Sequence, residues 1–240
     1  MNPIWARASQ IRGSPPSHTA GFRDRTTSHA MSLERYDLGG SRGLEVEGDR
    51  TGMDHTSLDR AHSEVRRRLE SVAAGQWDLP TPCDGWSVTD LVQHMAVGAT
   101  MSCQILAGEP WTRDSVVAEV SSSPDLKHEW EWRTAEERAG FAAPGALGRT
   151  VTHPIMGDIP CTQFLGMRAG DALLHAWDLA RAVGVDDELA SELVGEIWAN
   201  MSPMVGIIGK SGFFGSGPSG EVREDAPLQT RLLDLSGRRP

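Results

Sequence analysis

The stretch GDALLHAWDLA, residues 170–180, places a carboxylate and an imidazole in a mostly apolar run. Asp171 and His175 are four residues apart, and an α-helix advances about 3.6 residues per turn. The two side chains therefore project from the same side of a helix, one turn apart, where they can bind one common target. We predict that this helix starts with Thr162 as its N-cap and ends before Gly184. It is the most apolar helix of the chain, so we expect it to be central.

Apolar residues at helical spacing predict further helices on both sides of this segment. Ser87 and Asp90 form a capping-box pattern that opens a helix ending at Gly108. The core stripe of that helix consists of Val88, Leu91, Val92, Met95, Ala99, Ser102 and Leu106. Other helices are expected from Thr56 towards Gly75, over 124–142 behind a Ser123 cap, over 186–201, and as a short final helix with a basic tip within 227–240.

Two segments rich in glycine and proline separate these helices. Residues 144–160 are expected to form a turn or a weak hairpin, and residues 206–220 a mobile loop. Because four or five amphipathic helices occur without a confident strand, the sequence predicts an all-α helical bundle.

The composition excludes several classes of function. The formal net charge is -10, and residues 1–54 contribute nothing to it, because they hold seven Arg and seven acidic residues. An acidic body repels polyanions, so no nucleic-acid partner is expected. Three cysteines without a CxxC pair argue against a disulfide framework and favour a cytoplasmic protein. No apolar run approaches the ~20 residues that a membrane span requires.

Residues 1–54 differ from the rest of the chain. The first thirty residues are rich in Arg, Ser and Thr, and show neither periodicity nor an apolar signal-peptide core. We expect a disordered or mis-annotated N-terminal extension, with Met31 or Met53 as the true start, although the composition also overlaps that of a transit peptide. The expected domain is then residues 55–240.

A third group can join Asp171 and His175 from a neighbouring helix. His94 is the only histidine of the second predicted helix and lies on the flank of its core stripe. Two imidazoles and one carboxylate suit Zn²⁺ in an open site, or Fe²⁺ or Ni²⁺. The alternative interpretation is structural: Asp171 and His175 form only a hydrogen-bonded pair, and His94 is a satisfied core residue.

The segments TPCDGWSVTDLVQH, residues 81–94, and DALLHAWDLARAVG, residues 171–184, resemble the actinobacterial DinB-like superfamily. More closely, they resemble the metal-binding domain of mycothiol-dependent maleylpyruvate isomerase, and the ending APLQTRLLDLSGRRP is similar to that of a stand-alone subfamily. The resemblance implies a four-helix bundle that binds a divalent metal ion, Zn²⁺ before Ni²⁺ or Fe²⁺, through His94, Asp171 and His175.

Two departures from the isomerase pattern bear on the reaction. The isomerase has Glu where this chain has Asp171, and it carries a further C-terminal domain, whereas 56 residues follow Gly184 here. The resemblance therefore supports metal binding by this chain more strongly than it supports the isomerisation reaction. The resemblance implies an isomerase or transferase that uses mycothiol, a small thiol, on a small electrophilic substrate. A non-catalytic metal-binding or small-molecule-sensing module, and a metal-free helical interaction domain, are the alternatives.

Several other residues are open to more than one interpretation. Asp178 can accept the second ring N–H of His175 or pair with Arg181. Trp86 and Trp177 are expected in the core in preference to a substrate pocket, and Cys83 is expected to be structural. His153 has no assigned role. For His55, His62 and His128 solvated positions are expected, and VGIIGKSG, residues 205–212, departs from a phosphate loop at Met204.

Overall fold

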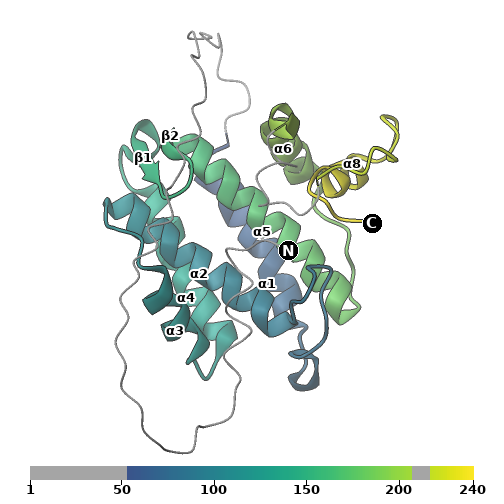
Figure 1. Cartoon of the computed structure of the whole chain (residues 1–240), viewed down its shortest axis with the longest axis horizontal. Helices are drawn as coiled ribbons and strands as arrows, with labels where there is room; N and C mark the ends of the chain where they lie inside the picture. The colour runs from purple at the N-terminus through teal and green to yellow at the C-terminus, as the bar shows by residue number, and fades with distance from the viewer. Residues whose placement is uncertain (1–52, 207–216) are drawn as a thin grey trace, which may run out of the picture.

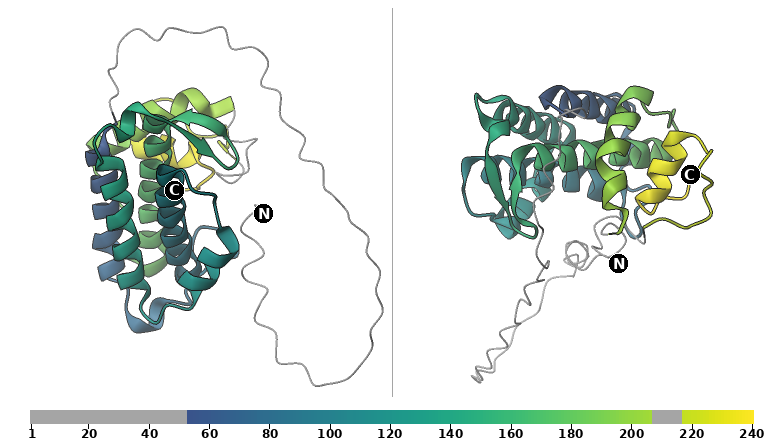
Figure 2. Two further views of the ribbon diagram at one scale, coloured as in Figure 1. Left: turned by 90° about the vertical axis from the view of Figure 1, so that its left-hand side faces the viewer. Right: turned by 90° about the horizontal axis from the view of Figure 1, so that it is seen from above.

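The computed structural model describes residues 53–206 and 217–240. Four long helices form a bundle and run side by side (Figures 1 and 2): α1 (His55–Glu70), α2 (Val88–Ala107), α4 (Leu126–Ala142) and α5 (Cys161–Val183). Helix α1 packs mainly on α5, and α2 mainly on α4. The predicted all-α bundle is confirmed. The extension up to residue 52 and the segment 207–216, which includes most of VGIIGKSG, lie outside the described residues.

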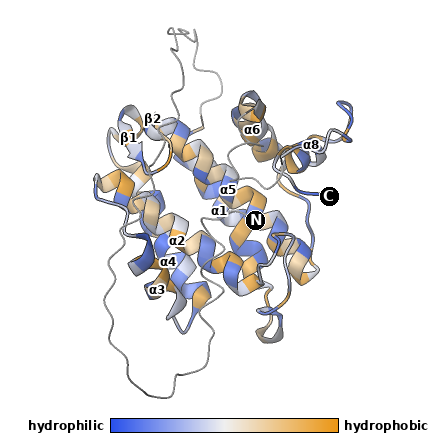
Figure 3. Ribbon diagram, viewed as in Figure 1, coloured by the Kyte–Doolittle hydropathy of each residue, from blue (hydrophilic) through white to orange (hydrophobic). Residues whose placement is uncertain are grey.

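Helix α5 is the centre of the bundle, as its apolar sequence predicts. Most of its residues are buried, and it contacts α1, α2 and α6. The helices carry alternating hydrophobic and hydrophilic patches (Figure 3), as expected of amphipathic helices. Met53 packs into the core and Asp54 caps α1, so these two residues pack with the helices. No helix of the described ranges is long and apolar enough to cross a membrane.

The predicted helix ends of α2 and α5 are confirmed. Ser87 and Asp90 form the capping box of α2, and all seven residues of its expected core stripe are buried. Gly108 and Gly184 end α2 and α5 with φ of 73° and 76°. Only glycine adopts this left-handed conformation without steric cost, which explains why each helix stops at that residue.

Other expected boundaries were wrong. Helix α3 (Arg113–Ser121) was not predicted, because Pro110 and Pro124 conceal a helix of only nine residues. Helix α4 starts at Leu126 behind an Asp125 cap, not at the expected Ser123 cap. Helix α5 starts at Cys161 directly behind a strand, so Thr162 is not its N-cap.

The C-terminal helices α6 (Ser191–Met201) and α8 (Leu228–Leu235) pack on each other beside α5 (Figure 1). Helix α6 starts five residues later than expected. The preceding acidic residues lie in an irregular segment instead, in which Asp186 accepts the Glu188 N–H at 3.0 Å and a hydrogen bond from Arg67 at 3.1 Å.

The segment expected as a weak hairpin is an antiparallel pair of strands, β1 (Thr150–His153) and β2 (Gly157–Pro160). Val151 pairs with Ile159, and both are buried against the bundle. His153 is also buried, and its Nδ1 accepts the N–H groups of Ile155 and Met156 at 3.3 and 3.2 Å. An imidazole that accepts at Nδ1 is neutral, so His153 stabilises the turn only in that form.

Burial, with the positive charge of Arg168, lowers the pKa of His153 to about 4. The contribution of neutral His153 to stability is fully present above its unfolded pKa of about 6.5 and is lost as the pH falls towards 4. In His153→Asn, an amide that does not titrate can still accept the turn N–H groups. We expect the free energy of unfolding of this variant to fall less between about pH 7 and 4 than that of the wild type, measured by urea unfolding. An equal pH dependence of the free energy of unfolding in variant and wild type would contradict this role. His128→Asn, at an exposed position, is the control.

Candidate metal centre

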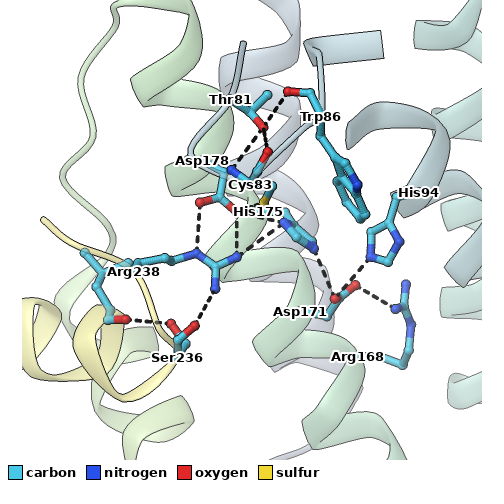
Figure 4. A network of polar contacts seen from close by, with 11 residues as sticks. Thr81, Cys83, Trp86, His94, Arg168, Asp171, His175, Asp178, Ser236 and Arg238 are labelled. Carbon is cyan, nitrogen blue, oxygen red and sulfur yellow. Dashed lines mark hydrogen bonds and ion pairs between the residues drawn. The ribbon is translucent and has the colours of Figure 1, made fainter. Parts of the chain in front are cut away.

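The three candidate ligands meet between α2 and α5. His94 Nε2 lies 3.5 Å from Asp171 Oδ1, and His175 Nε2 lies 3.3 Å from the same oxygen. The three donor atoms lie within 4.8 Å of one another. Figure 4 shows both rings directed at the Asp171 carboxylate. The structure therefore brings together the three residues selected from the sequence.

These distances fit a metal ion. Donors at about 2.0–2.1 Å from a tetrahedral Zn²⁺ are about 3.3–3.4 Å apart. The two separations from Asp171 Oδ1, 3.5 and 3.3 Å, are close to that edge length. The donor set, two imidazoles and one carboxylate, is one that Zn²⁺ accepts with a fourth position open. Asp171 keeps 23% of its side chain exposed.

Arg168, one turn before Asp171 on α5, holds the other carboxylate oxygen. Its Nη1 donates to Asp171 Oδ2 at 2.8 Å, which leaves Oδ1 for the two histidines. Burial alone would raise the pKa of Asp171, but His175 and Arg168 hold it well below its usual range. Asp171 is therefore an ionised carboxylate with a fixed orientation.

Arg168 is itself anchored in the core. Its Nε donates to Glu137 Oε1 at 2.7 Å, and Glu137 Oε2 lies 3.3 Å from His62 Nε2. Burial opposes ionisation of Glu137, yet Arg168 and His62 lower its pKa to about 2. The expected solvated position of His62 was wrong, because this side chain is 1% exposed and packs edge-on against Trp130. A buried ionic chain thus links α1 and α4 to the centre.

Asp178 contacts the His175 ring on the side opposite Asp171, at Nδ1. Its Oδ2 lies 2.8 Å from His175 Nδ1, and Arg238 binds both oxygens of the same carboxylate. Of the two interpretations of Asp178, the structure favours the partner of His175, since Arg181 pairs with Asp187 instead. Burial lowers the pKa of His94. For His175 the effect of burial is outweighed by Asp171 and Asp178, which raise its pKa well above the usual range.

A tight loop covers the two imidazoles. Thr81 accepts the Cys83 N–H through its hydroxyl at 3.2 Å and donates its own N–H to the Trp86 carbonyl at 2.9 Å. The Trp86 ring lies 4.9 Å from the His94 ring and 6.2 Å from the His175 ring, so Trp86 belongs to the site. Cys83 Sγ lies 3.3 Å from Asp178 Oδ2.

The remaining candidates lie elsewhere. Trp177 is buried in the core, as expected, and His153 belongs to the hairpin. His55 and His128 are exposed, also as expected. The three cysteines are free.

Four residues around the centre were not predicted from the sequence. Arg168 carried a usable signal, since it precedes Asp171 by three residues on the same helix face. His62 follows Leu58 by four residues and so occupies the core stripe of α1, although charged neighbours surround it. Glu137 and Arg238 have no spacing relation to the ligands, and only the tertiary fold reveals them.

Comparison with known proteins defines the class. The mycothiol maleylpyruvate isomerase N-terminal domain model matches residues 58–180, just over half of the 240 residues. The chain therefore belongs to this family, and the resemblance noted in the sequence is confirmed.

Individual proteins are also similar to this chain. The uncharacterized proteins Rv0738 and MT0763, from two strains of Mycobacterium tuberculosis, are each 35% identical over 150 residues, which cover 61% of this chain and 76% of theirs. Crystal structures of mycothiol-dependent maleylpyruvate isomerase and of a histidine-to-alanine mutant of it superpose with a TM-score of 0.53. They are 19–20% identical and cover 63% of this chain and 67% of theirs. At this identity the likeness shows the fold alone.

Gly98, one turn after His94, makes room for Arg168. A Cβ atom there would lie 2.8 Å from Arg168 Nη1, and this guanidinium cannot move freely because Glu137 and Asp171 hold it. We expect Gly98→Ala to lower the free energy of unfolding by about 1–3 kcal/mol despite the better helix propensity of alanine.

Gly195 in α6 is the matched control. A Cβ atom there meets nothing within 4 Å, so Gly195→Ala should raise stability by up to about 1 kcal/mol. Urea unfolding at neutral pH measures both variants. A stabilised Gly98→Ala protein would contradict the close packing of Arg168.

Proposed function

We propose that His94, Asp171 and His175 bind a divalent metal ion, with Zn²⁺ as the first candidate and Ni²⁺ or Fe²⁺ as alternatives. The observation that carries this proposal is the convergence of two imidazole nitrogens on one carboxylate oxygen, at 3.3 and 3.5 Å. A purely structural pair would explain His175 with Asp171. It would not explain a second ring, from another helix, directed at the same oxygen.

We further propose that the ion serves a thiol-dependent reaction, as an isomerase or transferase with mycothiol as the thiol and a small electrophile as the substrate. Membership of the mycothiol maleylpyruvate isomerase N-terminal domain family supports this proposal. A bound Lewis-acidic ion lowers the pKa of a coordinated thiol and polarises a carbonyl. Residues 55–240 are the proposed domain and the cytoplasm the proposed location, where small thiols are kept reduced.

The protein's own residues have separable roles in this proposal. Arg168 holds Asp171 so that one oxygen faces the ligand position. Asp178 holds the His175 ring by its Nδ1–H, which leaves Nε2 as the free donor. Trp86 lies against His94 and excludes water from one side of the centre. The exposed part of Asp171 marks the side on which a thiol and an electrophile can enter.

Removal of either histidine should abolish tight metal binding. We expect His94→Ala and His175→Ala each to weaken Zn²⁺ binding by more than about 100-fold, because losing an outer partner of a ligand already costs about 10–100-fold. Competition with a chromophoric chelator measures the affinity. His128→Ala, at an exposed position of α4, is the control. Retention of full affinity by either site variant would refute the assignment.

The reaction is tested with metal-loaded protein, mycothiol and a panel of small electrophiles that includes maleylpyruvate. We expect turnover that requires both the thiol and the ion and that is lost in His175→Ala. Product analysis measures the turnover. If the loaded protein binds metal but remains silent across the panel, the non-catalytic metal-binding or sensing module is the better interpretation.

A further inference from the structure

Arg238 lies beside the candidate ligands although it is 63 residues from His175 and outside the family-matched range 58–180. Its Nε donates to Asp178 Oδ1 at 2.9 Å, and its Nη2 donates to Asp178 Oδ2 at 2.5 Å. The same Nη2 is 3.4 Å from His175 Nδ1. Figure 4 shows the guanidinium reaching from the α8 segment to the carboxylate behind His175.

The backbone delivers Arg238 to this position in a defined way. Gly237 ends the α8 segment with φ 79°, its N–H donates to Asp234 O at 2.9 Å, and the Arg238 N–H donates to Leu233 O at 2.9 Å. These two bonds are those of a Schellman motif, which fixes the direction of the chain after a helix. Leu232 and Leu233 are fully buried, so α8 is anchored to the body of the protein.

With the Arg238 guanidinium in place, both oxygens of the Asp178 carboxylate have polar partners. Asp178 is fully buried, and its Oδ2 is contacted by His175 Nδ1, Arg238 and Cys83. Cys83, His175 and Asp178 have a spacing that could hold a metal ion. Arg238 already binds both Asp178 oxygens with its positive charge. In this second cluster the guanidinium therefore takes the place that a metal ion would occupy.

We propose that Arg238 is a positioning residue: through Asp178 it fixes the His175 ring so that Nε2 faces the point shared with His94 and Asp171. The inference rests on the proposed metal site and extends it to the α8 segment. A bidentate arginine fork holds a carboxylate plane in one orientation, and that plane sets the direction of the His175 Nδ1–H bond.

The test compares neighbouring arginines. Arg238→Met removes the fork, and Arg239→Met removes a half-exposed arginine that pairs with Asp234 at 3.2 Å. We expect Arg238→Met to weaken Co²⁺ binding about 10–100-fold, the usual cost of losing an outer partner of a ligand. Arg239→Met should leave the affinity unchanged. Both are measured by competition titration on the full chain.

Arg238→Met leaves a buried carboxylate without its cation and can lower stability. The double variant Asp178→Asn/Arg238→Met removes both charges, keeps an acceptor for His175 Nδ1–H and avoids that cost. We expect this protein to fold and to bind Co²⁺ at least about 10-fold more weakly than the wild type. Wild-type affinity in the double variant would overturn the proposal.

A metal-free readout separates the inference from the proposed function. In ¹⁵N–¹H spectra of the histidine rings, the His175 Nδ1–H of the wild type should be protected from solvent exchange. The double variant should exchange this proton faster, because its amide acceptor is no longer oriented by an arginine fork. Failure of the wild type to bind Co²⁺ would refute the metal site, and the spectra would still decide the role of Arg238. Unchanged His175 signals in the double variant would overturn it.

Discussion

The two oxygens of Asp171 face different partners: Oδ1 faces His94 and His175, and Oδ2 faces Arg168. A carboxylate that is largely removed from water is tolerated only with compensating charge and hydrogen bonds. The position of Arg168 is therefore a requirement of the centre. Glu137 fixes Arg168 from α4, and Gly98 leaves space for it on α2. The packing of three bundle helices is thus tied to the orientation of one carboxylate.

The sequence predicted the bundle well because its main helices follow simple rules. The apolar spacing of α2 is a local signal that predicts the helix, and the left-handed glycines after α2 and α5 are local signals that predict where these helices end. Errors arose where tertiary contacts set the boundary. Helix α5 starts at Cys161 because its N–H bonds to Arg149 O at 2.9 Å, in the strand-to-helix junction, and no local cap was needed.

The candidate ligands could also be selected from local sequence signals. Asp171 and His175 share one face of one helix, and His94 occupies the flank of its neighbour, so periodicity sufficed to select them. Their supporting residues follow no period. Arg238 reaches Asp178 across 60 residues, and the direction of its side chain depends on the turn at Gly237. Residues that bind can be read from helix faces, whereas residues that orient them depend on how distant segments pack.

Charge balance connects these supporting residues to the proposed chemistry. Three carboxylates, the buried Asp178 and Glu137 and the partly exposed Asp171, face two guanidinium groups, those of Arg168 and Arg238. With neutral histidines the cluster carries one net negative charge, and a divalent cation would reverse it to one positive charge. An anionic fourth ligand such as a thiolate would then make the cluster neutral. Neutrality favours a buried site because uncompensated charge is costly there. In the proposed metal-bound state the two arginines would therefore favour a singly charged anion as the fourth ligand, in agreement with the thiol-dependent function proposed above.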